Sequence, residues 1–133
     1  MVEKHNENKL VVLIRDHEFW RSQKAGFNGR EIIIGSPERI ERGNPVFRVS
    51  EDSIDLIGSS IAGIQGIIKL TGKSPTYCNM VYDGAVLKRG DEVAMLRMDK
   101  RIKLIRGDVI LLGHYNNGPE YSITITSIAD ITR

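Results

Sequence analysis

The clearest structural signal in the sequence is the segment from Leu104 to Gly113, which reads LIRGDVILLG. Its Arg106-Gly107-Asp108 portion supplies residues that form tight turns, and the short run that follows, Val109 to Leu112, is entirely apolar. Turn residues followed by such a run are typical of a β-strand that enters a packed sheet. The segment therefore predicts a chain reversal and then a strand.

The same alternation of short apolar runs and polar breaks extends along the chain in both directions. The runs are rich in Ile and Val, and the spacing typical of amphipathic helices is nearly absent. We expect an all-β fold, a β-sandwich of about 10–11 short, mostly antiparallel strands. The expected strands are Leu10 to Arg15, Glu31 to Gly35, Val46 to Val49, Ser53 to Ile57, Gln65 to Leu70, Met80 to Tyr82, Glu92 to Leu96, Arg101 to Ile105, Val109 to Leu112 and Tyr121 to Thr126.

An Arg-Gly-Asp tripeptide occurs twice, within Leu87 to Val93 and within Leu104 to Ile110. We interpret both as tight turns between strands, because Gly and Asp accommodate turn conformations. A cell-adhesion motif is the less favoured interpretation, since no secretion signal precedes it.

One stretch fits neither a strand nor a helix. The segment Trp20 to Arg30, WRSQKAGFNGR, has two glycines and no clear period, so we expect a long loop there. A short helical turn around Glu18 to Gln23 is an option within it. Phe19 and Trp20 would either anchor a partner or close one end of the core.

Composition excludes several classes of protein. The formal net charge is +2, which is too small a bias to indicate nucleic-acid binding by itself. The single cysteine, Cys78, excludes an internal disulfide, and its spacing from the three histidines indicates no metal site.

No signal peptide or membrane-spanning run is apparent, so we expect a cytoplasmic protein. Residues 1–8 are polar and are expected to form a flexible arm before a single domain, 9–133.

Four segments resemble the forkhead-associated (FHA) domain, a β-sandwich that binds partner proteins, usually through phosphothreonine, with loops at one end. Glu31 to Gly35 resembles its second strand, which ends in Ile-Gly, and Val81 to Gly84 resembles its Val-Asn-Gly turn. The segment from Ser53 through Ile68 resembles the one that carries the family's Ser-Arg-x-His signature. Leu104 to Gly113 is similar to its Leu-x-x-Gly-Asp-x-Ile-x-Leu-Gly motif and is the most specific match. The resemblance implies an FHA/SMAD-like sandwich.

The sequence departs from the family where the family binds phosphate. An Arg follows the Ile-Gly of the family's second strand, whereas Ser36 stands here. In the Ser-Arg-x-His signature, Ala62 replaces Ser, Gly63 replaces Arg and Gln65 replaces His. Phosphate recognition needs charge-assisted donors, so these losses indicate binding without phosphothreonine.

The family's Asn-Gly-Thr corresponds to Cys78, Asn79 and Met80, and the Asn of its turn becomes Asp83. Arg39, Arg42 or Ser60 are the substitute donors if phosphate is still recognised. The candidate binding residues at the loop end are therefore Ser36, Arg39, Arg42, Ser60, Gln65, Asn79 and Asp83.

A second candidate surface is a run of basic residues, which strand alternation would place partly on one face as a phosphate-attracting stripe. Asp99 and Asp108 interrupt this run, and aromatic residues, which stack on bases, are scarce near it. The run comprises Arg97, Lys100, Arg101, Lys103 and Arg106.

We expect no enzyme activity, because the sequence contains no nucleophile elbow and no phosphate-cradling glycine loop. We expect no cofactor either. The leading hypothesis is an FHA-like protein–protein interaction module, an adaptor or assembly subunit that is independent of phosphothreonine. A phosphopeptide-binding domain with substitute donors and a nucleic-acid-binding β-domain are the alternatives. The partner's identity and the oligomeric state stay open.

Overall fold

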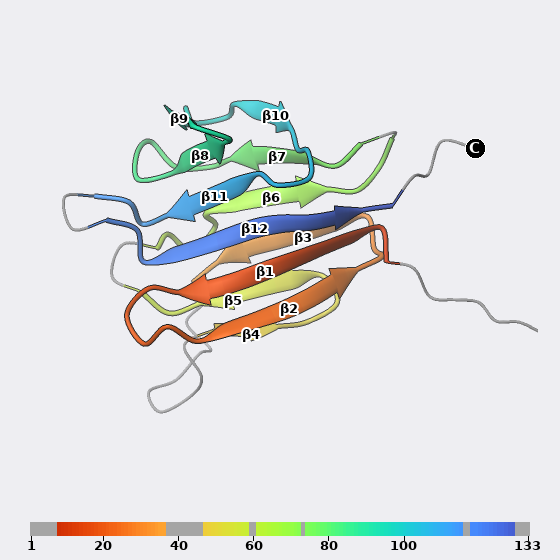
Figure 1. Cartoon of the computed structure of the whole chain (residues 1–133), viewed down its shortest axis with the longest axis horizontal. Coiled ribbons are helices and arrows are strands. Elements are labelled where there is room, and N and C mark those ends of the chain that lie inside the picture. The colour runs from red at the N-terminus through yellow and green to blue at the C-terminus, as the bar shows by residue number, and fades with distance from the viewer. Residues whose placement is uncertain (1–7, 37–46, 59–60, 73, 116–117, 130–133) are drawn as a thin grey trace, which may run out of the picture.

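The computed structural model describes residues 8–36, 47–58, 61–72, 74–115 and 118–129. Within these residues the chain forms twelve strands and no helix, arranged as two six-stranded sheets that pack face to face (Figure 1). No helix among them is long and apolar enough to cross a membrane. The β-sandwich that the sequence predicts is confirmed, with one or two strands more than expected.

The first sheet is antiparallel throughout and has the strand order β2-β1-β12-β11-β8-β9. Strand β1 lies between β2 and β12, so strands from the two ends of the described chain are neighbours (Figure 1). The strands of this sheet are β1 (Leu10–Asp16), β2 (Ser22–Phe27), β8 (Val86–Arg89), β9 (Glu92–Met95), β11 (Val109–Leu112) and β12 (Tyr121–Ile128).

The second sheet has the order β10-β7-β6-β3-β5-β4, and only the β3–β5 pair within it is parallel. Between β9 and β11 the chain leaves the first sheet, adds β10 to the edge of the second, and returns. The strands of this sheet are β3 (Glu31–Gly35), β4 (Phe47–Val49), β5 (Ser53–Leu56), β6 (Gly66–Lys69), β7 (Thr76–Asn79) and β10 (Arg101–Lys103).

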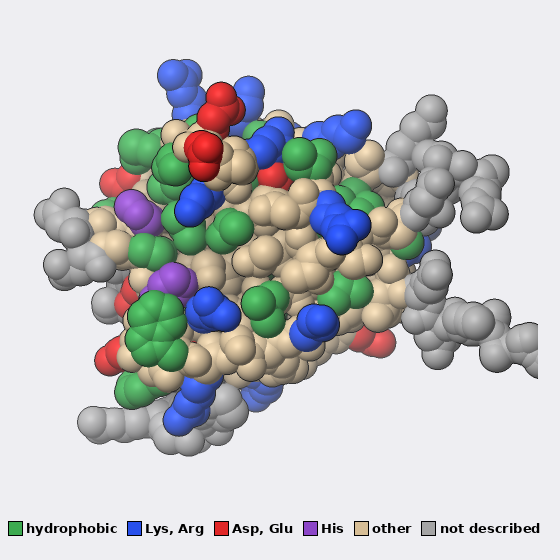
Figure 2. Space-filling model, in the orientation of Figure 1, with side chains coloured by type: hydrophobic (Ala, Val, Ile, Leu, Met, Phe, Trp, Pro, Cys, Tyr) green, Lys and Arg blue, Asp and Glu red, His purple; other side chains and the backbone are tan. Residues whose placement is uncertain are grey.

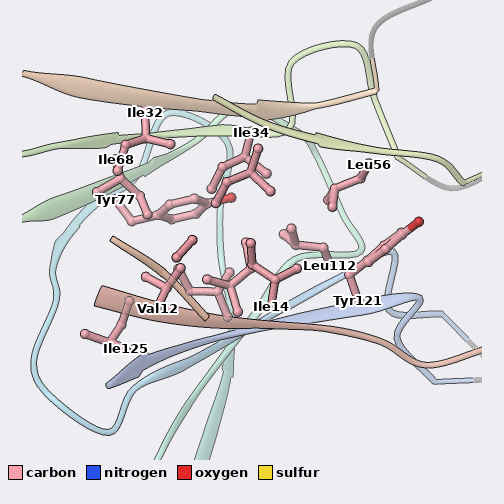
Figure 3. Packing of buried hydrophobic residues seen from close by; sticks show 14 of the residues in the cluster. Val12, Ile14, Ile32, Ile34, Leu56, Ile68, Tyr77, Leu112, Tyr121 and Ile125 are labelled. Carbon is pink, nitrogen blue, oxygen red and sulfur yellow. The ribbon is translucent and has the colours of Figure 1, made fainter. Parts of the chain in front are cut away.

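The core lies between the sheets and consists of every second residue of the central strands (Figure 3). This is what alternation requires, because successive side chains of a strand point to opposite faces. The first sheet contributes Val12, Ile14, Leu112, Tyr121 and Ile125, and the second contributes Ile32, Ile34, Leu56, Ile68 and Tyr77.

Most of the expected strands are confirmed, and Glu31–Gly35 and Val109–Leu112 are confirmed residue for residue. The long loop expected at Trp20 to Arg30 is wrong, since β2 occupies most of it. Strand β2 lies at a sheet edge and buries only Ala25 and Phe27, so it lacks an apolar run. No helix forms around Glu18 to Gln23, where residues 17–19 form a turn and β2 begins at Ser22.

The strand expected at Met80 to Tyr82 is also wrong. The strand is β7, just before it, and the apolar residues at 80–82 belong to the connection that follows. Strand β8 was not among the expected strands, because its last two residues are basic and exposed. Val46 and residues 1–7 lie outside the described residues, and the division into an arm and one domain stays a prediction.

The two Arg-Gly-Asp tripeptides are both turns, as predicted, with φ of +61° at Gly90 and +94° at Gly107. They are also joined to each other. Arg89, from the first tripeptide, donates to both carboxylate oxygens of Asp108, from the second, at 2.8 and 2.7 Å. Asp108 is fully buried and also accepts the backbone N–H of Ile105 at 2.9 Å. Arg89 further donates to the carbonyl of Lys103 in β10, so one side chain links the two sheets.

We predict that Arg89→Ala lowers the free energy of unfolding by about 2 kcal/mol, because it removes both charged hydrogen bonds that Arg89 donates to the buried carboxylate of Asp108. Urea denaturation of the full chain measures this change. Arg106→Ala is the matched control, since Arg106 is the exposed arginine of the second tripeptide and exposed substitutions usually shift stability by less than about 0.5 kcal/mol. Equal effects of the two substitutions would contradict the prediction.

Candidate functional site

The connections after β1, β5, β7 and β11 gather at one end of the sandwich, at the left in Figure 1, which we call the loop end. Backbone hydrogen bonds join these connections directly. The N–H of His17 donates to the carbonyl of Glu120 at 2.9 Å, and that of His114 donates to Gly84 at 2.8 Å. The connections at the loop end are therefore held together by hydrogen bonds and are not independent loops.

The segment after β5 packs directly on the end of β3. The backbone N–H of Ser36 donates to the carbonyl of Ala62 at 2.9 Å. Gly35 has no room for a side chain, because a Cβ there would lie 2.0 Å from the carbonyl oxygen of Gly63. Ala62 and Gly63 thus bring only backbone groups to this part of the loop end.

Gln65, a candidate binding residue, is buried and holds this segment in place. Its side-chain Oε1 accepts the backbone N–H of Ala62 at 3.0 Å, and its own N–H donates to Ile34 at 2.7 Å. Its carbonyl accepts the N–H of Met80 at 3.1 Å, which ties the β7–β8 connection to the same point. The side chain is therefore engaged in loop structure.

Asn79 is fully buried at the end of β7. Its Nδ2 donates to the carbonyls of Val81 at 2.9 Å and Leu96 at 3.2 Å. Its Oδ1 has no hydrogen-bond partner among the described residues. Asp83, by contrast, is exposed and accepts the hydroxyl of Tyr115 at 2.8 Å, a bond that raises the pKa of that tyrosine.

The structure thus brings Ser36, Gln65 and Asn79 together at the loop end through their backbone and amide bonds. Asp83 lies on the connection that follows Asn79. Arg39, Arg42 and Ser60 lie outside the described residues. A role in binding stays a prediction for all of these residues.

The β1–β2 loop, His17 to Arg21, presents two aromatic side chains to solvent. Phe19 is 56% exposed and Trp20 is 66% exposed, so neither closes the core. The carboxylate of Asp16 accepts the backbone N–H groups of the two residues after His17, at 3.0 and 2.8 Å. Trp20 has a φ of +59°, a left-handed conformation that is unusual for a bulky residue. The loop is therefore held in a shape that keeps both rings outside.

His17 lies behind these rings. Its Nε2 is 3.0 Å from the hydroxyl of Ser122, and its ring centroid is 5.2 Å from that of Trp20. Burial, and then the charge of Arg15, lower the pKa of His17 below its usual value of 6.5. Folding therefore disfavours the protonated imidazole of His17.

A pocket of ≈ 620 Å³ opens beside the β1–β2 loop, bounded by Ile57 and by the β11–β12 connection. Its described lining includes the carboxylates of Asp16, Glu18 and Glu120 and contains neither lysine nor arginine. Such a pocket is electrostatically unsuited to a phosphate dianion. Figure 2 shows hydrophobic and histidine side chains gathered at this end, whereas Lys and Arg side chains are spread across the face.

The basic residues lie elsewhere, on the second sheet's edge and the connections around it. Arg101 and Lys103 point outward from β10, as alternation predicts, with Ile102 half-buried between them. The remaining three are exposed in the connections on either side of β10, and they are Arg97, Lys100 and Arg106. Asp99 lies among them with a φ of +64°.

The two-sheet sandwich, with its connected loops at one end, is the FHA fold. The structure of the yeast splicing factor Pml1 is similar at a TM-score of 0.63 and 12% identity, over 94% of this chain and 83% of that one. An engineered FHA domain with a Myc-pTBD peptide is similar at 0.62 and 12%, over 92% and 94%. The FHA domain of a hypothetical protein from Arabidopsis thaliana is similar at 0.57 and 18%, over 99% of each chain.

No protein-family model matches the sequence, and a search of curated proteins finds no match. The predicted resemblance to the FHA domain is thus confirmed for the fold. At sequence identities this low, the solved structures establish the fold alone, and a function has to be inferred from the residues of the site.

Two features of the structure were not predicted from the sequence, one at the loop end and one between the two sheets. The first is the support of the β1–β2 loop by Asp16 and His17. An Asp shortly before the aromatic pair Phe19-Trp20 is a signal in the sequence that could have indicated it. The second is the cross-link from Arg89 to Asp108. The repeated tripeptide signalled two turns, but nothing in it indicated that they bond to each other.

We predict that Asn79→Ala lowers the free energy of unfolding by about 1–3 kcal/mol, because the carbonyls of Val81 and Leu96 lose their donor. Asp83→Ala, at the neighbouring exposed candidate, should change it by less than about 0.5 kcal/mol. Urea denaturation compares the two. An unchanged stability of Asn79→Ala would show that the amide is not structural.

We predict that His17 makes the fold less stable in acid. Because its pKa is lowered on folding, the unfolded chain takes up a proton first as the pH falls below 6.5. The stability that His17 contributes in its neutral form is therefore fully present above pH 6.5. It is lost as the pH falls towards the lower pKa that His17 has in the folded state. Urea unfolding followed by the fluorescence of Trp20, the single tryptophan, should show this loss. In His17→Gln the loss should be smaller, and a larger loss there would contradict the assignment.

Proposed function

We propose that this chain is a protein–protein interaction module that acts as an adaptor or assembly subunit, and that it binds its partner without reading phosphothreonine. It is not an enzyme in this proposal, and it acts in the cytoplasm. The observation that carries the proposal is which side chains of the loop end form internal hydrogen bonds and which are exposed. The Oε1 of Gln65 and the Nδ2 of Asn79 form internal hydrogen bonds, while Phe19 and Trp20 are exposed.

The chemistry of the loop end supports a protein partner rather than a phosphate. Tryptophan is, with tyrosine and arginine, among the residues that most often dominate protein interfaces, and aromatic side chains bury a large area on contact. The described lining of the adjacent pocket includes three carboxylates and neither lysine nor arginine, which disfavours binding of a dianion. Structures with this fold include a splicing factor integrated into the RES complex and a domain with a Myc-pTBD peptide, so the fold accommodates such partners.

The test is a titration of the full chain with a degenerate phosphothreonine peptide library and with its unphosphorylated twin. We expect no difference between the two libraries. Binding of the phosphorylated library alone, at micromolar strength, would overturn the proposal. Its loss in the triple variant Arg39→Ala, Arg42→Ala, Ser60→Ala would then establish the phosphopeptide alternative.

For any unphosphorylated peptide selected in this way, we predict that Phe19→Ala and Trp20→Ala each weaken binding by about tenfold or more, as interface anchors do. The matched control is Arg101→Ala with Lys103→Ala, on the exposed face of β10, which should leave the affinity unchanged. The reverse pattern would assign binding to the basic face.

A nucleic-acid-binding function is the remaining candidate, favoured by the exposure of Arg101 and Lys103 on one strand face. It predicts binding that weakens steeply with salt. A mobility-shift assay at low salt tests it, and the absence of any shift would remove it.

A further inference from the structure

Strand β9 is an open edge of the first sheet. It lies at the end of the strand order, beside β8 (Figure 1), and all four of its residues are exposed. Three of the four are apolar, and the two large ones, Val93 at 63% exposed and Met95 at 69%, point to the same face. Figure 2 shows hydrophobic side chains over the β8–β9 hairpin beside acidic ones. An exposed apolar edge strand is a template for pairing with another strand.

The other edges of the described sheets are protected against such pairing. Strand β10 is three residues long and presents Arg101 and Lys103, and β4 is also three residues long. Strand β2 has a polar, exposed first half that includes Lys24. Short strands and charged residues are the usual protection of sheet edges. Strand β9 is one residue longer than β4 and β10, and the face that carries Val93 and Met95 has no charged residue of β9.

The hydrogen-bond pattern shows which backbone groups of β9 face the open edge. The N–H of Leu96 donates to the carbonyl of Ala85 at 2.9 Å, so this pair bonds across the hairpin. Bonded and non-bonded pairs alternate in an antiparallel ladder, which makes Ala94 with Leu87 the next bonded pair. The N–H and C=O groups of Val93 and Met95 therefore point away from β8.

The geometry points to a second copy of this chain as the occupant of this edge, paired antiparallel about a two-fold axis at Ala94. In this register Val93 lies opposite Met95 of the second copy, and each such pair forms two backbone hydrogen bonds with the outward-facing groups. The apolar side chains then cover one another on the outer face. The two first sheets become one continuous sheet across the contact.

Charge selects this register over its neighbours. With Ala94 on the axis, Asp91 lies opposite Arg97 of the second copy, and both residues are exposed. Shifting the axis to Val93 places Asp91 opposite Met95, and shifting it to Met95 places Arg97 opposite Val93. Only the register centred on Ala94 pairs apolar with apolar and acid with base. This inference does not depend on the proposed function.

Sedimentation velocity of the full chain at low ionic strength, over a range of protein concentrations, tests the inference. We expect a reversible monomer–dimer equilibrium. Asp91→Arg and Arg97→Asp should each weaken dimerisation by roughly tenfold or more, because each places like charges opposite one another. An equimolar mixture of the two variants should dimerise again, since every Arg then faces an Asp. Arg106→Asp, an equal charge change at an exposed position outside β9, should dimerise like the unmodified chain.

A second variant tests the backbone contacts. Val93→Pro removes an N–H that faces the open edge and leaves the bonds to β8 in place, so it should abolish dimerisation while the far-ultraviolet circular dichroism stays unchanged. The inference is overturned if the unmodified chain is monomeric at every concentration. It is equally overturned if the charge variants or Val93→Pro dimerise normally, or if the mixture stays monomeric.

Discussion

The bidentate bond between Arg89 and Asp108 is the constraint on which much of this sandwich depends. The chain leaves the first sheet after β9 and returns to it at β11, with β10 placed in the second sheet between them. Arg89 closes this excursion, because it holds Asp108 at the start of β11 and the carbonyl of Lys103 at the end of β10. A buried carboxylate is costly unless it is paired and hydrogen-bonded, and Asp108 is both. The pair therefore fixes where the two sheets meet at one edge.

The sequence predicted the central strands well because they are buried on at least one face. Glu31–Gly35 and Val109–Leu112 each contain an apolar run, and such a run follows from burial. Strand β2 was missed because an edge strand needs only two inward residues, Ala25 and Phe27, to join the sheet. Strand pairing with a distant partner, rather than local composition, makes it a strand. A short segment of sequence, taken alone, does not show with which distant strand it pairs.

The candidate site shows the same division between local and distant information. The sequence allows a prediction of which residue types stand at the family's binding positions, with Ala62 and Gly63 in place of Ser and Arg, and that alignment stays a prediction. The burial and hydrogen bonding of Asn79 could not be predicted, because one of its bonds goes to the carbonyl of Leu96, which lies 17 positions away. The exposure of Trp20 was equally hidden, since it follows from the capping of the loop by Asp16. Tertiary contacts decide which polar groups are free, and those contacts are not encoded in any one motif.

The pairing of β1 with β12 has a consequence for how the chain reaches this structure. Leu10 lies opposite Ile128, so the first sheet cannot close until almost the whole described chain is present. Contacts between such distant residues carry a large loop-closure entropy and are associated with folding in milliseconds to seconds rather than microseconds. During synthesis β1 and β2 therefore leave the ribosome long before their partner. Their apolar residues stay open to chaperones, or to other nascent chains, until β12 arrives.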